Sequence, residues 1–307
     1  MSASPSQRPR SVIVTRLRVA GCVFAEDEAQ LLISAARTPA DLAAMVDRRA
    51  AGLPLEQVLG WAEFCGLRIA VDPGVFVPRR RTEFLVDQAA ALARVAASPT
   101  CQALARPGAV VVDLCCGSGA VGAALVAALD RVELYAADID PAAVRCARRN
   151  LAAAGGQVYE GDLYEPLPAT LRGRVDVLVA ITPYVPTEAI RLMPPEARIH
   201  EPRVALDGGA AGLDVLRRVI AAAPSWLAPG GYLLVETSDR QAPQTVGTLA
   251  RNGLIPRVAR SDDLGATVVI GARPELHSGL ASELCSTAWQ AHEPRRVAAD
   301  RSGSGRR

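Results

Sequence analysis

The feature that most constrains the fold is a regular alternation of apolar runs and helical segments that begins at Ala109. The apolar runs are AVVVDLCC, VELYAADID, VDVLVAI, GYLLVETS and ATVVIGA, and segments such as AVGAALVAAL and PAAVRCARRNLAAAG lie between them. Such an alternation arises when each strand is connected to the next by a helix that packs on the sheet. The pattern therefore predicts an α/β fold with a doubly wound, mostly parallel sheet.

The rest of the chain divides where this pattern changes. Residues 1–11 are expected to be a flexible N-terminus, and residues 12–92 a helical domain that ends in a hairpin connector, EFCGLRIAVDPG. Residues 93–108 predict a linker, residues 109–273 the α/β domain, and residues 274–307 a disordered tail. The first 24 residues carry four Arg and no acid, as transit peptides do, but they continue into a helical pattern and are interpreted as part of a folded domain.

Composition excludes several kinds of chemistry. All 34 basic residues are Arg, so mechanisms that need a Lys are excluded, and this usage suggests a GC-rich bacterial genome. The net charge of +2 is too small to predict a specific nucleic-acid partner or a membrane surface, and no apolar run is long enough to span a bilayer. Seven Cys without a CxxC spacing, and three separated His, indicate reduced thiols in a cytoplasmic protein that has no metal site.

A glycine-containing turn follows the first apolar run, in VVDLCCGSGAVG. Gly117 and Gly119 permit positive φ and a close approach by a ligand. Gly122 follows with the spacing of the dinucleotide motif, but that reading fails because Asp113 lies before the turn, where its carboxylate would repel a diphosphate. A cationic ligand would tolerate that carboxylate, and S-adenosylmethionine carries a sulfonium and an ammonium group. Charge therefore favours S-adenosylmethionine over a dinucleotide.

Two further carboxylates stand where such a ligand can bind. Asp138 ends the next strand and can accept hydrogen bonds from ribose hydroxyls, while Asp140 is expected to cap the helix that begins at Pro141. The alternative is that both acids are only caps. Asp162 can accept from an adenine amino group with Leu163 against the ring, although an Asp in a turn is common.

Together these motifs resemble one family, the HemK/PrmC-type protein glutamine-N5 methyltransferases, over residues 12–272. The most specific part is PLEQVLGWAEFCGLRIAVDPGVFVPRRRTEFLV, which resembles the segment between that family's helical N-terminal domain and its catalytic domain. The blocks EPRVALDGGAAGLDVLRRVI, LAPGGYLLVET and DDLGATVVIGAR follow in the family's order. The resemblance implies a Rossmann-like, class I S-adenosylmethionine-dependent methyltransferase sheet and a helical domain that recognises the substrate.

The resemblance also implies the site residues. The family's cofactor contacts fall on Asp113, Cys115, Cys116, Gly117, Ser118, Gly119, Asp138, Asp162, Leu163 and Ile181. Its catalytic loop, Asn-Pro-Pro-Tyr, falls on Ile181, Thr182, Pro183 and Tyr184. In the family the Asn and the next backbone carbonyl accept the two N–H groups of a glutamine amide, and the Tyr ring packs on it.

Several positions depart from the family pattern. Ile181 has no hydrogen-bond acceptor, so one buried amide proton would lack a partner, at a cost of about 1–3 kcal/mol. Thr182 replaces a Pro, and Cys115 replaces a Gly in the turn. In the segment PRRRTE, Arg80 stands in place of a Pro and Arg81 in place of an acid.

The expected function is methyl transfer from S-adenosylmethionine to the N5 amide nitrogen of a protein glutamine. The resemblance implies a peptide-chain release factor as the protein substrate, in the cytoplasm. Ile181 leaves two alternatives open. One is a protein that binds S-adenosylmethionine with little catalysis, and the other is a methyltransferase whose acceptor is a hydroxyl, a thiol or a small molecule.

Overall fold

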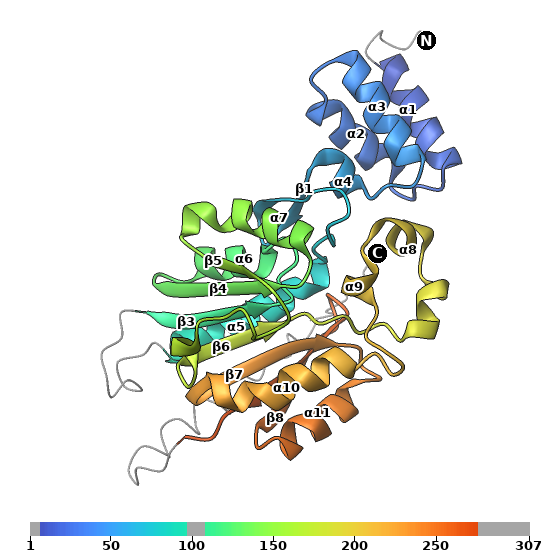
Figure 1. The fold of residues 1–307 in the computed structure, drawn as a ribbon. Coiled ribbons are helices and arrows are strands. Elements are labelled where there is room, and N and C mark those ends of the chain that lie inside the picture. The colour runs from blue at the N-terminus through green and yellow to red at the C-terminus, as the bar shows by residue number, and fades with distance from the viewer. Residues whose placement is uncertain (1–6, 97–107, 276–307) are drawn as a thin grey trace, which may run out of the picture. The chain divides into compact units, whose positions relative to one another are not determined.

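The main sheet has seven strands in a computed structural model that describes residues 7–96 and 108–275 (Figure 1). The strands are β3 (Ala109–Leu114), β4 (Val132–Asp138), β5 (Gln157–Glu160), β6 (Val175–Ala180), β7 (Leu227–Thr237), β8 (Ile255–Ser261) and β9 (Ala266–Ala272). Their order is β5-β4-β3-β6-β7-β9-β8, and β9 runs antiparallel to both of its neighbours. The doubly wound α/β sheet that the sequence predicted is therefore confirmed.

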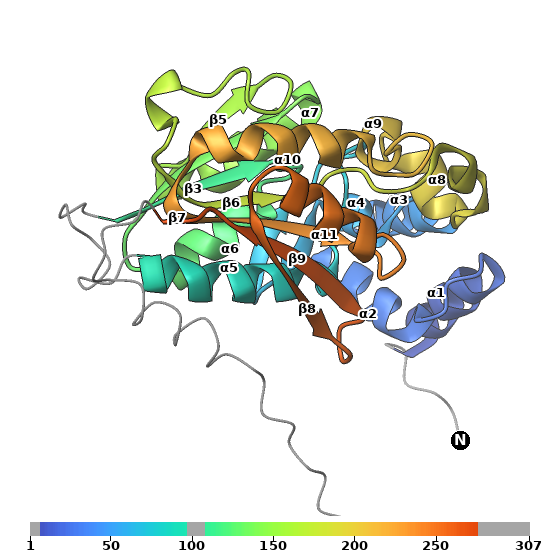
Figure 2. The same cartoon turned by 90° about the horizontal axis from the view of Figure 1, so that it is seen from below.

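Long helices cover both faces of this sheet. They are α5 (Glu83–Ala96), α6 (Ala120–Ala128), α7 (Pro141–Leu151), α10 (Asp214–Trp226) and α11 (Ala242–Arg251). Figure 2 shows α5 and α6 on one face and α10 and α11 on the other. Every residue of β3 and β6 is buried as a result, which explains why those two strands read as continuous apolar runs.

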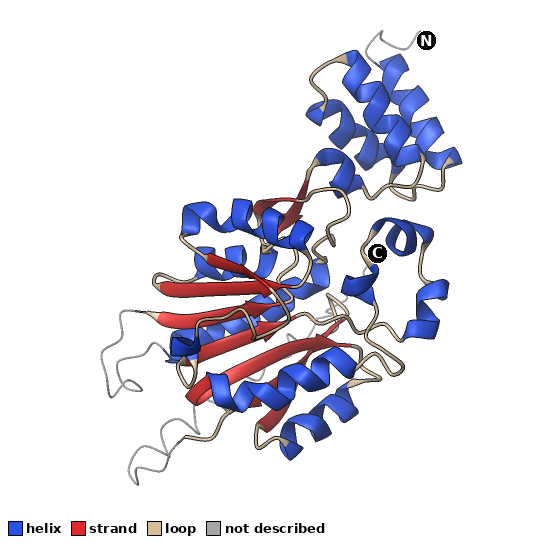
Figure 3. Cartoon of the chain, viewed as in Figure 1, coloured by secondary structure: helices blue, strands red, loops and turns tan. Residues whose placement is uncertain are grey.

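A small helical domain precedes the sheet (Figure 3). It consists of α1 (Gln7–Val19), α2 (Ala25–Ala35), α3 (Pro39–Ala50) and α4 (Leu55–Leu59). Its own core includes Leu17, Leu32 and Val46. The predicted hairpin follows as β1 (Trp61–Phe64) and β2 (Leu67–Ala70), which pair antiparallel.

The structure places two boundaries differently from the sequence. Helix α1 begins at Gln7, inside the segment 1–11 that was expected to be flexible. Helix α5 continues to Ala96, so it includes the first residues of the expected linker, and its buried face, which includes Leu85, packs on the sheet. We therefore group α5 with the α/β domain. Residues 97–107 and 276–307, which hold most of the predicted linker and tail, lie outside the described residues.

A segment rich in proline connects β6 to α10. This proline-rich segment, residues 185–206, contains only short helices: η4 (Thr187–Leu192), α8 (Pro195–His200) and α9 (Arg203–Leu206). The other short helices are η1 (Arg80–Thr82), η2 (Ala152–Ala154) and η3 (Ala169–Leu171). Within residues 7–96 and 108–275, no helix has the length and apolar character needed to cross a membrane.

Candidate active site

A pocket opens at the carboxyl ends of β3, β4 and β6. Strand β3 lies between β4 and β6, so the connections reverse direction there, and α/β proteins bind ligands at this kind of reversal. The predicted site residues that line the pocket are Cys115, Cys116, Gly117, Ser118, Asp138, Asp162, Leu163, Ile181, Thr182, Pro183 and Tyr184. Asp113 and Gly119 are not among its lining residues.

The glycine-containing turn forms one wall of the pocket. Cys115 adopts φ 55° and Gly117 φ 54°, both in the left-handed region. A Cβ at Gly117 would meet no heavy atom within 4 Å, so the turn leaves open space for a ligand there. Gly119, with φ 77°, precedes α6, where a Cβ would approach Ala147 of α7 to 3.1 Å. Gly119 therefore serves helix packing in this structure.

Asp113 lies beneath the turn and is fully buried. Its carboxylate accepts a hydrogen bond from the backbone N–H of Gly122 at 3.0 Å. Burial raises the pKa of Asp113 to about 7, against the effect of that hydrogen bond. The structure thus places this acid behind the pocket wall rather than in direct reach of a ligand.

Asp138 is held by the turn and lines the pocket. Its carboxylate accepts from the backbone N–H of Gly117 at 2.8 Å and from that of Asp140 at 2.9 Å. Burial raises the pKa of Asp138, and these hydrogen bonds oppose the shift. Asp140 caps α7 as predicted, accepting from the N–H of Ala142 at 2.8 Å.

Asp162 already has a partner that the sequence did not indicate. Its carboxylate accepts from Arg218 of α10 at 2.6 Å, and both side chains line the pocket. Leu163 follows with φ 50° and is buried against the same wall. Nothing in the local sequence around Arg218 distinguishes it from other surface arginines, because its partner is distant along the chain.

The two adjacent cysteines are free thiols, of which Cys116 is buried and Cys115 is partly buried. Cys115 and Cys116 carry no disulfide, and burial raises the pKa of both well above the ordinary range. Both thiols are therefore protonated and weakly nucleophilic at neutral pH.

The loop Ile181 to Tyr184 continues directly from β6 into the pocket. Thr182 is only 1% exposed, and its hydroxyl has no hydrogen-bond partner among the described residues. The backbone carbonyl of Tyr184 accepts from the side chain of Gln241 at 3.0 Å, and its hydroxyl accepts from Arg81. Burial raises the pKa of Tyr184, and the charge of Arg81 opposes this shift.

The segment PRRRTE contributes two arginines to the pocket, Arg79 and Arg81, whose role the sequence did not indicate. Arg79 donates to the buried carboxylate of Glu201 at 2.5 Å, and Arg81 donates to Glu236 at 2.9 Å. A Thr directly before α5 predicts a cap for that helix from the sequence alone, and this prediction is wrong. The hydroxyl of Thr82 instead donates to Glu236 at 2.6 Å, which takes the side chain away from the helix start.

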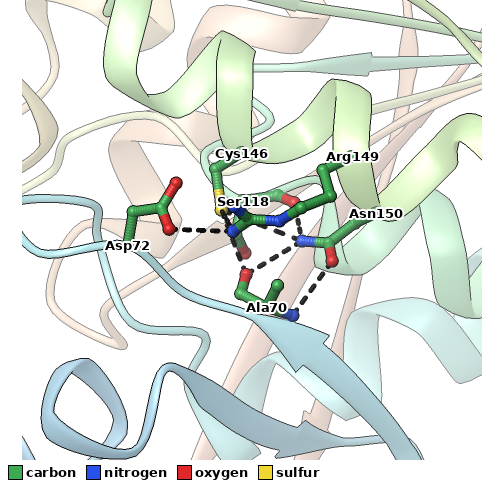
Figure 4. A network of polar contacts seen from close by, with 6 residues as sticks. All are labelled: Ala70, Asp72, Ser118, Cys146, Arg149 and Asn150. Carbon is green, nitrogen blue, oxygen red and sulfur yellow. Dashed lines mark hydrogen bonds and ion pairs between the residues drawn. The ribbon is translucent and has the colours of Figure 1, made fainter.

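The hairpin is fastened to the glycine-containing turn by Asn150 (Figure 4). The Asn150 amide exchanges two hydrogen bonds with the backbone of Ala70, both at 2.9 Å, and donates to the carbonyl of Ser118 at 2.8 Å. Arg149 adds an ion pair with Asp72 at 2.9 Å. One side chain of α7 therefore links β2 to the wall of the pocket.

The residues present fit S-adenosylmethionine. The open space at Gly117 can receive a ligand, the Asp138 carboxylate retains lone pairs for hydroxyl groups, and Leu163 offers an apolar face. Asp138, Asp140 and Asp162 place three carboxylates on this side of the pocket, which suits a ligand with a sulfonium and an ammonium group.

Comparison with known proteins decides the family. The family model of the methyltransferase small domain matches residues 67–206. The release factor glutamine methyltransferase of Geobacter sulfurreducens is 38% identical over 240 residues, which cover 76% of this chain and 79% of that protein. The chain belongs to the release factor glutamine methyltransferase family. The corresponding protein of Gloeobacter violaceus is 39% identical over 216 residues, covering 69% of this chain and 71% of its own length.

Family membership confirms the HemK/PrmC-type resemblance. The chain is an S-adenosylmethionine-dependent methyltransferase, as the sequence predicted. A relative with a different name is the 4-amino-L-phenylalanine/4-methylamino-L-phenylalanine methyltransferase of Streptomyces pristinaespiralis. It is 37% identical over 199 residues, covering 64% of this chain and 65% of that protein.

Proposed function

We propose that this methyltransferase acts on the side-chain amide nitrogen of a glutamine in a peptide-chain release factor. The support is the similarity of this chain to relatives that are named release factor glutamine methyltransferase. The observation that carries the proposal is that the loop Ile181 to Tyr184 and the glycine-containing turn line one pocket. A cofactor and an acceptor can meet only where such a turn and such a loop are close together.

When bound, S-adenosylmethionine supplies an electrophilic methyl group. In our proposal the turn from Cys115 to Ser118, Asp138, Asp162 and Leu163 hold this cofactor. Asp138 accepts from the ribose hydroxyls with the lone pairs that Gly117 and Asp140 leave free. Asp162 is fixed by Arg218, which leaves its second oxygen for an amino group.

The acceptor side of the pocket works by positioning. An amide nitrogen is a poor nucleophile because its lone pair is delocalised into the carbonyl group, so the rate depends on holding it in line with the methyl group. The fixed ring of Tyr184 provides a surface for the amide, and the backbone carbonyl of Thr182 can accept one N–H. Ile181 contributes shape but accepts no hydrogen bond, so we expect slower transfer than with an Asn at this position.

The helical domain recognises the protein that carries the glutamine. Arg49 of α3 donates to Glu196 of the proline-rich segment at 3.3 Å, which joins the domain to a segment that lines the pocket through Met193 and Val204. Leu192 and Ile199 of the same segment are 73% and 64% exposed. Exposed apolar side chains beside a pocket are suited to binding another protein.

The proposal is tested by incubating the protein with S-adenosylmethionine and a purified release factor, and measuring glutamine N5-methylation by mass spectrometry. The variant Ile181→Asn should raise the rate at least tenfold, since one oriented hydrogen bond to the reacting group contributes about 1.4 kcal/mol or more. Calorimetry on both proteins controls for cofactor binding. The proposal fails if both bind S-adenosylmethionine normally and neither methylates the release factor.

A second candidate acceptor is an aromatic amine. Two observations favour it: Ile181 offers no acceptor for an amide N–H, and one relative is named for the methylation of 4-amino-L-phenylalanine. The same assay with 4-amino-L-phenylalanine separates the two candidates. Transfer to the amine and not to the release factor would favour the small-molecule acceptor, and transfer to neither, with normal cofactor binding, would favour a binding protein.

A further inference from the structure

Arg81 connects the loop of Tyr184 to the sheet. Its Nε donates to Oε1 of Glu236 at 2.9 Å, and an Nη2 N–H donates to the hydroxyl of Tyr184. The Glu236 side chain is only 4% exposed and also accepts from the hydroxyl of Thr82 at 2.6 Å. The buried carboxylate of Glu236, at the end of β7, therefore fixes the Arg81 guanidinium, and the guanidinium in turn fixes the Tyr184 hydroxyl.

Tyr184 is held at its backbone and at its hydroxyl. Gln241 donates to its backbone carbonyl at 3.0 Å, and Arg81 donates to its hydroxyl. The guanidinium carbon of Arg81 also lies 5.8 Å from the centre of the Tyr184 ring. Because a guanidinium has only donors, the Tyr184 oxygen is the acceptor in this contact. The ring orientation thus depends on a residue more than a hundred positions earlier in the chain.

We propose that Arg81 is a positioning residue that fixes the Tyr184 ring against the methyl acceptor. This inference rests on the proposed function for the role of the ring itself. A carboxylate at position 81, which the family pattern would place there, has no proton to donate to Tyr184 and would repel the buried Glu236. The side chain of Ile181 gives the methyl acceptor no hydrogen bond. The orientation of the acceptor therefore depends more on the Tyr184 ring in this chain than it would with an Asn at position 181.

Arg79 provides a matched control. It lies two residues before Arg81, lines the same pocket and pairs with a buried carboxylate, that of Glu201, at 2.5 Å. Among the described residues it makes no hydrogen bond to Tyr184. A change at Arg79 therefore removes a comparable ion pair without removing the contact to the phenol.

The first experiment needs no methyl acceptor. The full chain, with its five tyrosines replaced by 3-fluorotyrosine, is studied by fluorine NMR, and the Tyr184 signal is identified by its absence in Tyr184→Phe. Arg81→Ala should shift or broaden that signal, and Arg79→Ala should leave it in place. If Arg81→Ala does not fold, Arg81→Lys replaces it, because the lysine keeps a positive charge beside Glu236. The lysine should also change the Tyr184 signal, because one ammonium group cannot reach both Glu236 and Tyr184 as the forked guanidinium does. An unchanged Tyr184 signal in the Arg81 variants, or an equal change in Arg79→Ala, overturns the inference.

The second experiment is a double-mutant cycle on methyl transfer at saturating S-adenosylmethionine. Arg81→Lys and Tyr184→Phe should each lower kcat at least fivefold, and the double variant should be no more than twofold slower than either, because both remove one bond. Arg79→Ala combined with Tyr184→Phe should instead multiply the two losses. Multiplied losses for the Arg81 pair would refute the inference and leave the proposed function intact. A wild-type protein that methylates no acceptor would refute the proposed function, and the NMR result would still decide the contact.

Discussion

The buried hydroxyl of Thr182 destabilises the folded state. This hydroxyl is buried without a partner among the described residues, whereas the equally buried hydroxyl of Thr82 donates to Glu236. Thr182→Val should therefore raise the free energy of unfolding by about 1 kcal/mol, and Thr82→Val should lower it by about 1.5–3 kcal/mol. Urea unfolding followed by circular dichroism measures both, and a loss of stability in Thr182→Val would show that the hydroxyl is satisfied in solution.

Asp113 should make stability depend on pH. Its pKa of about 7 in the folded protein lies above the ordinary value near 4, so between these values the folded protein holds a proton that the unfolded chain has released. The free energy of unfolding therefore falls as pH rises from about 4 to 7. Asp113→Asn, which keeps an acceptor for Gly122, should reduce the fall between pH 5 and pH 7 by on the order of 2–3 kcal/mol.

The measurement for Asp113 is urea unfolding of the wild-type protein and the variant at both pH values. Asp138 and Glu201, whose pKa values burial also raises, will leave a residual slope of the same sign in the variant. Identical slopes in the two proteins would mean that Asp113 is ionised throughout this range.

Single residues also show what a sequence can predict. Thr38 and Asp140 each stand directly before a Pro that opens a helix, so the sequence alone predicts both caps, because a cap bonds to a backbone group two or three residues away. Thr82 does not cap its helix, because a carboxylate that lies 154 positions later competes for its hydroxyl. The sequence therefore predicts side-chain hydrogen bonds to nearby backbone groups, but not those to a partner that is distant along the chain.

At the scale of elements, the link between hairpin and pocket depends on Asn150. Asn150→Leu removes three hydrogen bonds and leaves the carbonyl of Ser118 without this donor, so we expect a loss of about 2–4 kcal/mol in unfolding free energy. The amide proton of Ala70 should also exchange faster with solvent, as measured by NMR. The control is Arg149→Ala, which breaks a half-exposed ion pair with Asp72 and should cost less than about 1 kcal/mol. Equal effects of the two changes would contradict the role given to Asn150.

Strands β3, β4, β6, β7 and β9 were predictable because each forms an apolar run bounded by turns, and the hairpin because its residues alternate. Strand β8 was not predicted, because no residue in it is buried and it forms no apolar run. The sequence also placed the turn and the loop Ile181 to Tyr184 at strand ends, and the pocket brings them together. The sequence did not indicate the pairing of Arg218 with Asp162 or that of Arg81 with Glu236, because each joins residues of two different elements. The boundary near residue 92 was misplaced because α5 has the same helical period as the domain before it and differs only in what it packs against.

At the scale of the whole molecule, a buried ion pair stabilises the helical domain. Arg49 donates to Glu28 at 2.6 Å, with both side chains about one-tenth exposed, and reaches Glu196 outside the domain. Arg49→Ala leaves a buried carboxylate unpaired and should lower stability by about 3–5 kcal/mol. Glu196→Gln removes only the partly exposed partner and should cost less than about 1 kcal/mol. Urea unfolding compares the two, and a small effect of Arg49→Ala would show that Glu28 finds water or another partner.

The position of β9 has a consequence for how the chain matures on the ribosome. β9 is the last strand of the main sheet to be synthesised, yet it lies between β7 and β8 and pairs with both. Until residues 266–272 emerge, β7 presents an open edge and β8 has no strand to join, and open edges invite pairing with other chains. The nascent protein therefore passes through a period in which the sheet is incomplete although most of its strands exist. Molecular chaperones that shield exposed strand edges would act during that period.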